Sequence, residues 1–172
     1  GSGATLTGTY LTSGSGDFIG NFGTAGMTVK ISDGATMTVA ANRVDGSDGP
    51  TLQKVGDSGT GAVAVKIGDA DKAVNMTTIS SSGAASTTFT VFETIDNFTG
   101  TLASTTGVAA GATLNLTAAK ATGKTITGAG SGSVNVTALD QTLDANVSAI
   151  TAATGSGATL TGTYLTSGSG DF

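Results

Sequence analysis

Pairs of aspartates in Gly- and Ser-rich segments are the first residues here that suggest a chemistry, the binding of a cation. The segments are Asp45-Gly46-Ser47-Asp48-Gly49 and Gly68-Asp69-Ala70-Asp71. Ca²⁺ accepts six to eight oxygen ligands in loose geometry, and a loop with two carboxylates and several carbonyls offers them. Asp is also common in plain turns, because its side chain bonds to nearby backbone. The sequence therefore predicts calcium at Asp45/Asp48 and Asp69/Asp71, with ordinary turns as the alternative, and suggests no other cofactor.

Five Asn-apolar-Thr/Ser triplets form a second pattern, and each is formally an acceptor for N-glycosylation. They begin at Asn75, Asn97, Asn115, Asn135 and Asn146. On a strand, residues i and i+2 share a face, so the Asn and the hydroxyl point outward while the middle residue enters the core. A ladder of Asn and Thr side chains explains four of the five without any sugar. Asp144 precedes Asn146 by two residues, which resembles the extended bacterial acceptor sequence and makes Asn146 the best single candidate.

The residue types that most catalytic sites need are missing or scattered. The chain has no His and no Cys, and its only Arg is Arg43. No Gly-rich stretch stands between a strand and a helix, where it would hold phosphate. Asp69 and Asp71 could serve as the carboxylate pair of a polysaccharide-cleaving β-helix, but such chemistry needs a closed cleft. We expect that the chain is not an enzyme.

The elements that position these residues belong to a repeat. Residues 1–18 and 155–172 are identical and read GSGATLTGTYLTSGSGDF, which gives a period of 155 − 1 = 154 residues. We interpret residues 1–154 as one complete repeat unit and residues 155–172 as the start of the next, with an engineered overlap as the alternative. A repeat must be recognised before any other reasoning about fold, because its units stack on one another.

Composition excludes several classes of partner. Charged residues make up 11% of the chain, aromatics 5%, and the formal net charge is −5. Soluble domains typically have roughly 25% charged residues. Because Lys and Arg form no run, we expect no nucleic-acid partner. No apolar stretch approaches the ~20 residues that span a bilayer, so we expect no membrane span in this segment.

Alternation of apolar and polar residues predicts many short strands with one buried face. Examples are Met27/Val29/Ile31 and Val63/Val65/Ile67, with GSG, DG and TTG turn signals between such runs. The segment Ala138–Ala153 comes closest to a helical pattern but lacks clear start and stop signals. The sequence therefore predicts an all-β chain.

The spacing of these runs favours one all-β architecture. Seven strand starts were compared, at Leu6, Met27, Val63, Phe89, Leu114, Val134 and Leu160, and the intervals between them are 21, 36, 26, 25, 20 and 26 residues. Five of the six intervals match one solenoid coil, and the longest contains an extra strand-like piece, Thr36–Val39. We predict a β-solenoid, similar to a parallel β-helix, of about six coils per repeat. A tandem immunoglobulin-like β-sandwich is the alternative.

Two segments resemble a known group of proteins. GATLNLTAA (111–119) and TITGAGSGSVNVT (125–137) look like bacterial surface-layer proteins and giant β-strand repeat-containing adhesins. The resemblance is compositional, covers most of the chain and transfers no functional residue. The segment Ser13–Ile19 approaches a calcium β-roll motif but lacks the spacer between Gly and Asp.

What the resemblance implies is an extracellular scaffold or fibre. We expect a structural repeat module of a long protein on the cell surface, which assembles with head-to-tail and lateral copies of itself into a filament, stalk or layer. The alternative is a spacer repeat of a large calcium-dependent adhesin whose binding domain lies elsewhere.

Overall fold

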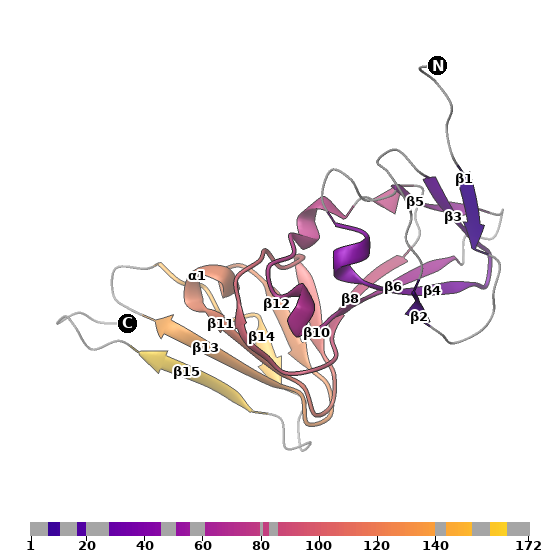
Figure 1. Cartoon of the computed structure of the whole chain (residues 1–172). Coiled ribbons are helices and arrows are strands. Elements are labelled where there is room, and N and C mark those ends of the chain that lie inside the picture. Colours follow the sequence, from indigo (N-terminus) through magenta and orange to yellow (C-terminus); the bar gives the residue numbers. More distant parts are fainter. Residues whose placement is uncertain are drawn as a thin grey trace. The chain divides into compact units, whose positions relative to one another are not determined.

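The computed structural model describes residues 7–10, 17–19, 28–45, 51–55, 61–79, 81–82, 86–139, 144–152 and 159–164. The chain folds as a β-solenoid of about five turns, which confirms the predicted architecture. It divides into two compact units, one made of residues 1–66 and 75–88 and the other of residues 67–74 and 89–172. Figure 1 shows the elements of both units along the chain.

Strands of the first unit alternate between two parallel sheets. One sheet has the order β1-β3-β5-β7, and in the other β4 pairs with β2 and with β6. The strands are β1 (Thr7–Tyr10), β2 (Asp17–Phe18), β3 (Thr28–Ser32), β4 (Thr36–Ala40), β5 (Thr51–Val55), β6 (Ala62–Ile67) and β7 (Ser81–Ser82). Two 3₁₀ helices, η1 (Ala41–Arg43) and η3 (Met76–Thr78), lie between them in sequence.

Registers in the first unit show how one coil stacks on the next. Thr28 of β3 pairs with Thr7 of β1, and on the other side with Thr51 of β5. Residues in register in a parallel pair share a face, so apolar side chains stack in columns. Val29 and Ile31 of β3 are buried, as are Met37 and Val39 of β4. The alternation that predicted these strands therefore forms the core.

The second unit repeats the same arrangement. One sheet has the order β15-β13-β11-β9, and the other pairs β8, β10, β12 and β14 in succession. The elements are η2 (Asp69–Asp71), β8 (Ser86–Val91), β9 (Ile95–Phe98), β10 (Thr105–Val108), β11 (Thr113–Thr117), α1 (Ala118–Ala121), β12 (Thr125–Gly128), β13 (Ser133–Leu139), β14 (Ile150–Ala152) and β15 (Leu160–Tyr164). Every strand pair found among the described residues of either unit is parallel, which excludes the antiparallel β-sandwich.

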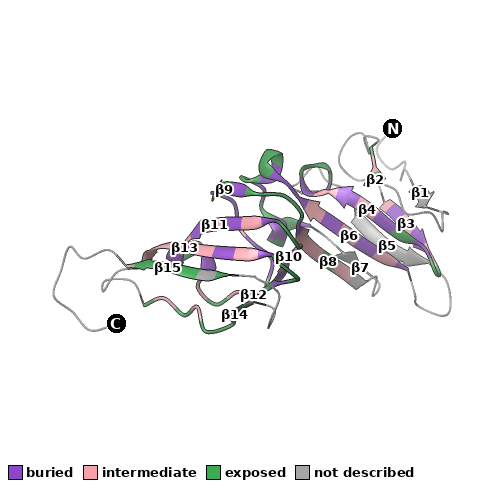
Figure 2. Cartoon of the chain, turned by 90° about the horizontal axis from the view of Figure 1, so that it is seen from below, coloured by how far each residue is buried: buried purple, intermediate pink, exposed green. Residues whose placement is uncertain are grey.

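Two consecutive coils of the second unit superimpose at an offset of 20 residues. Thr105 pairs with Thr125 in one sheet, and Thr113 pairs with Ser133 in the other. The corner between the sheets closes in the same way in both coils: Ala112 N–H donates to the Ala109 carbonyl at 3.1 Å, and Gly132 N–H donates to the Ala129 carbonyl at 2.9 Å. Figure 2 shows buried and half-buried residues alternating along β11 and β13.

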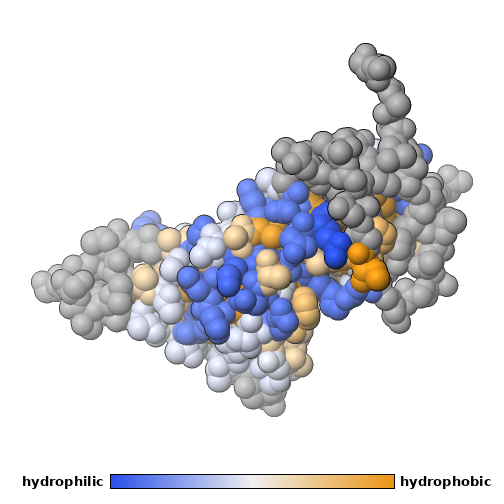
Figure 3. All heavy atoms as spheres, viewed as in Figure 1, coloured by the Kyte–Doolittle hydropathy of each residue, from blue (hydrophilic) through white to orange (hydrophobic). Residues whose placement is uncertain are grey.

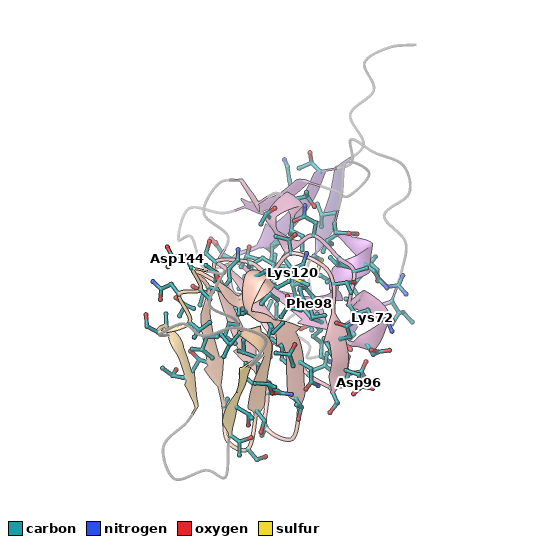
Figure 4. All side chains as sticks on the ribbon, turned by 90° about the vertical axis from the view of Figure 1, so that its left-hand side faces the viewer. Lys72, Asp96, Phe98, Lys120 and Asp144 are labelled. Atoms are coloured by element: carbon teal, nitrogen blue, oxygen red, sulfur yellow. The ribbon has the colours of Figure 1, made fainter. Side chains whose placement is uncertain are left out.

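A β-bulge interrupts this alternation in β9. Ile95 pairs with Leu114, but Phe98 rather than Asn97 pairs with Leu116, so one strand contains an extra residue. Asp96 and Asn97 are both exposed, whereas Ile95 and Phe98 are buried. Figure 4 shows the result, with Phe98 among the inner side chains and Asp96 at the surface.

Registers correct the spacing of the predicted strand starts. Leu114, Val134 and Leu160 occupy equivalent positions, because Val134 pairs with both of the others. Met27 and Val63 do not: Met27 precedes β3, and Val63 lies in β6 of the other sheet of that unit. The interval of 36 residues is long because it crosses from one sheet to the other, and the extra piece Thr36–Val39 is strand β4.

Helical structure lies outside the segment in which the sequence came closest to a helical pattern. In Ala138–Ala153, the described residues form the end of β13, an irregular stretch and β14. The α-helix is a single turn, α1, at a corner of the solenoid. Its length of 4 residues is too short to produce a periodic signal.

Candidate functional site

Asp71 lies at a corner of the second unit and is buried. Only 3% of its surface is exposed, and its Oδ2 accepts a hydrogen bond from the Gly68 N–H at 2.8 Å. Gly68 stands directly before η2, so the carboxylate binds the free backbone donor at the start of this helical turn. Asp71 therefore stabilises its own corner.

Asp69 and Glu93 complete this corner. Lys72 Nζ donates to Asp69 Oδ2 at 3.3 Å, and the Asp69 N–H donates to Glu93 Oε1 at 2.7 Å. Both side chains of the Asp69–Lys72 pair are half exposed. The sequence analysis did not include Glu93, because 24 residues separate it from Asp69. Only the stacking of coils brings the two together.

The acidic corner is not arranged around a central cation. Within the ranges that the structure describes, no group of three or more His, Cys, Asp or Glu residues is placed to hold a metal ion. The carboxylates of Asp69 and Asp71 already bind Lys72 and the Gly68 N–H. Calcium at this pair stays a prediction that requires these carboxylates to change partners.

Asp45 follows η1 in the first unit and is half-buried. Its N–H donates to the Ala41 carbonyl at 3.1 Å, which closes the helical turn. Asp48, the other half of the predicted calcium pair, lies outside the described residues. The calcium site at Asp45/Asp48 therefore stays a prediction.

Two of the Asn-apolar-Thr/Ser triplets lie on neighbouring strands of the second unit and form a ladder. Asn135 Nδ2 donates to Asn115 Oδ1 at 3.0 Å, and Asn115 Nδ2 donates to the Ile95 carbonyl at 2.9 Å. Both Asn side chains are part-buried. The Asn115 and Asn135 amides thus join three consecutive strands, β9, β11 and β13, as the ladder interpretation predicts.

Two other triplets lie at corners and have a different geometry. Asn75 Oδ1 accepts from Thr77 N–H at 3.1 Å and from Thr77 Oγ1 at 2.7 Å. Asn146 Oδ1 accepts from Ser148 N–H at 3.2 Å and from Ser148 Oγ at 2.7 Å. Both Asn residues are exposed. Each carbonyl oxygen therefore holds its own turn, which leaves the amide nitrogen at the surface.

The fifth triplet begins at Asn97 on the bulge of β9. Asn97 is exposed, and Thr99 Oγ1 donates to the Lys72 carbonyl at 3.3 Å rather than to Asn97. Four of the five middle residues, Met76, Phe98, Leu116 and Val136, are buried. The rule that the middle residue enters the core therefore holds for strands, the bulge and one of the two corners.

The surface around these sites is mixed. Among the described residues, Ile19 and Phe92 are the exposed large hydrophobic side chains, at 83% and 41%. Figure 3 shows hydrophilic and weakly hydrophobic side chains interspersed on the face in view. None of the described helices has the length and apolar character needed to cross a membrane.

Strand edges are the remaining candidate binding surface. β1 ends the sheet β1-β3-β5-β7, and β15 ends the sheet β15-β13-β11-β9. A terminal strand carries backbone donors and acceptors that a further strand can pair with. The sequence signal for these edges is the identity of residues 7–10 and 161–164, both Thr-Gly-Thr-Tyr.

Together these features define a β-solenoid whose polar side chains serve coil stacking and corner formation. Comparisons with family models, curated proteins and solved structures give no match to this chain. Its function must therefore be argued from the repeat, the sheets and their edges.

Proposed function

We propose that this chain is a structural repeat module of a long extracellular surface protein that forms a filament, stalk or cell-surface layer. One observation carries the proposal. Thr7–Tyr10 and Thr161–Tyr164 have the same sequence, and each lies in the terminal strand of a parallel sheet. Coils of a solenoid contact only their neighbours, so another repeat extends such a sheet without changing the fold.

The extracellular location is supported by composition and by the resemblance to repetitive surface proteins. Small polar residues and Gly dominate the chain, and charged residues are 11%. Short side chains allow close stacking of many thin coils and require no large aromatic core. This composition suits a long, uniform wall.

The proposal assigns a mechanical role rather than a catalytic one. The chain contains neither His nor Cys. The acidic side chains of the Asp69/Asp71 corner bind backbone and lysine groups, as a stabilised turn requires. Backbone ladders and the Asn115/Asn135 stack link coil to coil, which is the interaction that an extended scaffold depends on.

The length added by each repeat tests this function. At ~4.8 Å per coil, five to seven coils advance the axis by roughly 24–34 Å. A separate globular domain of this size has a radius of gyration near ~15 Å, so a chain of such domains would advance by ~38 Å or more per repeat. Small-angle scattering or electron microscopy of chains with two, four and six repeats measures the increment.

A constant increment below ~35 Å, with a smooth rod, is the expected result. Beads spaced at more than ~40 Å would contradict a continuous scaffold. Immunolabelling of intact cells would then test the location separately, and a signal confined to permeabilised cells would contradict the extracellular part of the proposal.

A further inference from the structure

The same four-residue sequence pairs along different strands at the two ends of the chain. In β15, residues 161–164 pair with β13, the strand of the preceding coil. In β1, residues 7–10 pair with β3, the strand of the following coil. Each therefore has one partner strand, and the two partners lie on opposite sides in the direction of winding. A single strand of this sequence could occupy both positions at once.

Registers of the two pairings agree residue by residue. Gly162 pairs with Val136, and Gly8 pairs with Val29; both valines are buried. The difference 162 − 8 is the 154-residue period. The inner column of one pairing therefore continues as the inner column of the other.

The outer columns agree in the same way. Thr161 pairs with Asn135, and Thr7 pairs with Thr28; Asn135 and Thr28 are both half-buried. A slip of one residue would place an inner column against an outer one, because side chains alternate between faces. The coil lengths also agree, since the offset from Val134 to Leu160 is 26 residues and that from Thr7 to Thr28 is 21.

We propose that the edge of β13 binds the segment Thr7–Tyr10 of a second copy of this chain, in the register that Thr161–Tyr164 has now. The incoming segment replaces β15 and carries its own β3 on its other edge. The inference deepens the proposed function and rests on it, because it names the surface through which repeats join. The partner is recognised by main-chain hydrogen bonds and by the Gly and Thr columns.

Competition with β15 sets the conditions for exchange. The bonds made by the two identical segments are the same, so the difference lies in the tether. A covalently attached segment acts at an effective concentration in the millimolar range. Exchange between intact chains is therefore expected only near that concentration, and weakening β15 should lower the concentration required.

Substitutions in the second copy of the segment test this. Gly162→Pro with Thr163→Pro removes one backbone donor toward each edge of β15, because successive N–H groups of a strand point to opposite sides. Residues 1–18 stay intact in this variant. Sedimentation velocity should show head-to-tail oligomers at least tenfold below the concentration at which the unaltered chain associates.

The first copy provides the matched control. Gly8→Pro with Thr9→Pro disables the donor segment and leaves β15 in place, so this variant should stay monomeric. The protein with all four substitutions has an open acceptor edge and no donor, and it should also stay monomeric. Equal association of the four-substitution protein and the Gly162→Pro/Thr163→Pro protein would show non-specific aggregation and overturn the proposal.

A disulfide trap tests the register without proline. The chain has no Cys, so Asn135→Cys introduces a single thiol. An eighteen-residue peptide of residues 1–18 carrying Thr7→Cys should cross-link to it, because residues in register lie within disulfide range. The same peptide carrying Thr9→Cys is two residues out of register, and we expect at least fivefold less adduct in mass spectra.

Equal yields from the two peptides, or no adduct from either, would overturn the docking register. Failure of docking is distinguishable from failure of the proposed function. A smooth rod with a short increment but no exchange would remove only the docking site at β13. Beaded tandem chains whose β13 edge still captures the peptide would instead remove only the continuous scaffold.

Discussion

Polar side chains on the sheets and polar side chains at the corners bond over very different distances along the sequence. On the sheets, Asn115 and Asn135 bond to groups 20 residues away. At the corners, Asn75 and Asn146 bond to residues two positions away. The same Asn-apolar-Thr/Ser pattern therefore links coils in one place and shapes a single turn in the other.

Backbone conformation decides between these two roles. An Asn in a continuous strand has the Asn of the next coil directly beside it, as the pairing of Asn115 with Asn135 shows. An Asn at the start of a turn, such as Asn75 before η3, reaches the backbone of its own turn first. Sheet triplets should thus contribute to cohesion between coils, whereas corner triplets should contribute locally.

The largest expected effect concerns Asp71, a corner side chain that is buried. Asp71→Ala removes the acceptor of the Gly68 N–H inside the fold. A hydrogen bond to a charged group contributes about 1.5–3 kcal/mol, so we expect a loss of about 2–3 kcal/mol in the free energy of unfolding. Urea unfolding measures it, with Asp69→Ala as the control, because the exposed Asp69–Lys72 pair is worth about 0.5 kcal/mol or less.

Calcium gives this experiment a second outcome. If Asp71 is only a structural cap, the loss should be the same in Ca²⁺ and in EGTA. A loss that disappears in EGTA would establish the predicted calcium site and would show that the corner bonds something other than its own turn.

The next effect compares two residues of the ladder. Asn115→Ala leaves both the Ile95 carbonyl and the Asn135 amide without a partner, and we expect a loss of about 1–2 kcal/mol. Asn135→Ala should cost about 0.5–1 kcal/mol, because its own buried Oδ1 already lacks a partner. Urea unfolding of both variants gives the order, and an equal or larger loss for Asn135→Ala would refute cohesion through the ladder.

The smallest effect is expected at the corners. Asn146→Ala and Asn75→Ala remove exposed hydrogen bonds to the next residue but one, so we expect a loss of about 0.5 kcal/mol or less for each. Their amide nitrogens are also the ones open to a sugar. A bacterial N-glycosylating enzyme acting on the folded chain should modify Asn146, while Asn115 and Asn135 stay free, as peptide mass spectrometry can show. Similar occupancy at all three would contradict the comparison.

The fold was largely predictable because period-two alternation and coil spacing report the same geometry. Leu114, Val134 and Leu160 were placed at equivalent positions, and their registers confirm it. The pairing of Met27 with Val63 was wrong, because each coil has a strand in both sheets and both sheets have the same alternation. Only hydrogen-bond register distinguishes one sheet from the other.

The candidate sites were less predictable, since their partners are distant in sequence. Nothing near Asp69 indicates Glu93, and nothing near Asn115 indicates the Ile95 carbonyl. Corner geometry was equally hidden: the triplets at Asn75 and Asn146 read like those on strands. Coil stacking, and the local choice between strand and turn, supply information that residue types alone lack.

Parallel stacking also determines how such a chain would respond to a pulling force. The bonds between β11 and β13 run from one coil to the next, along the direction in which coils accumulate. Tension between the ends would therefore open one row at a time, like a zip, rather than shear many rows together. Each released coil of 20 residues frees roughly 60 Å of extended chain. Force spectroscopy would record a regular series of small steps, and a surface protein built this way would absorb shock by lengthening.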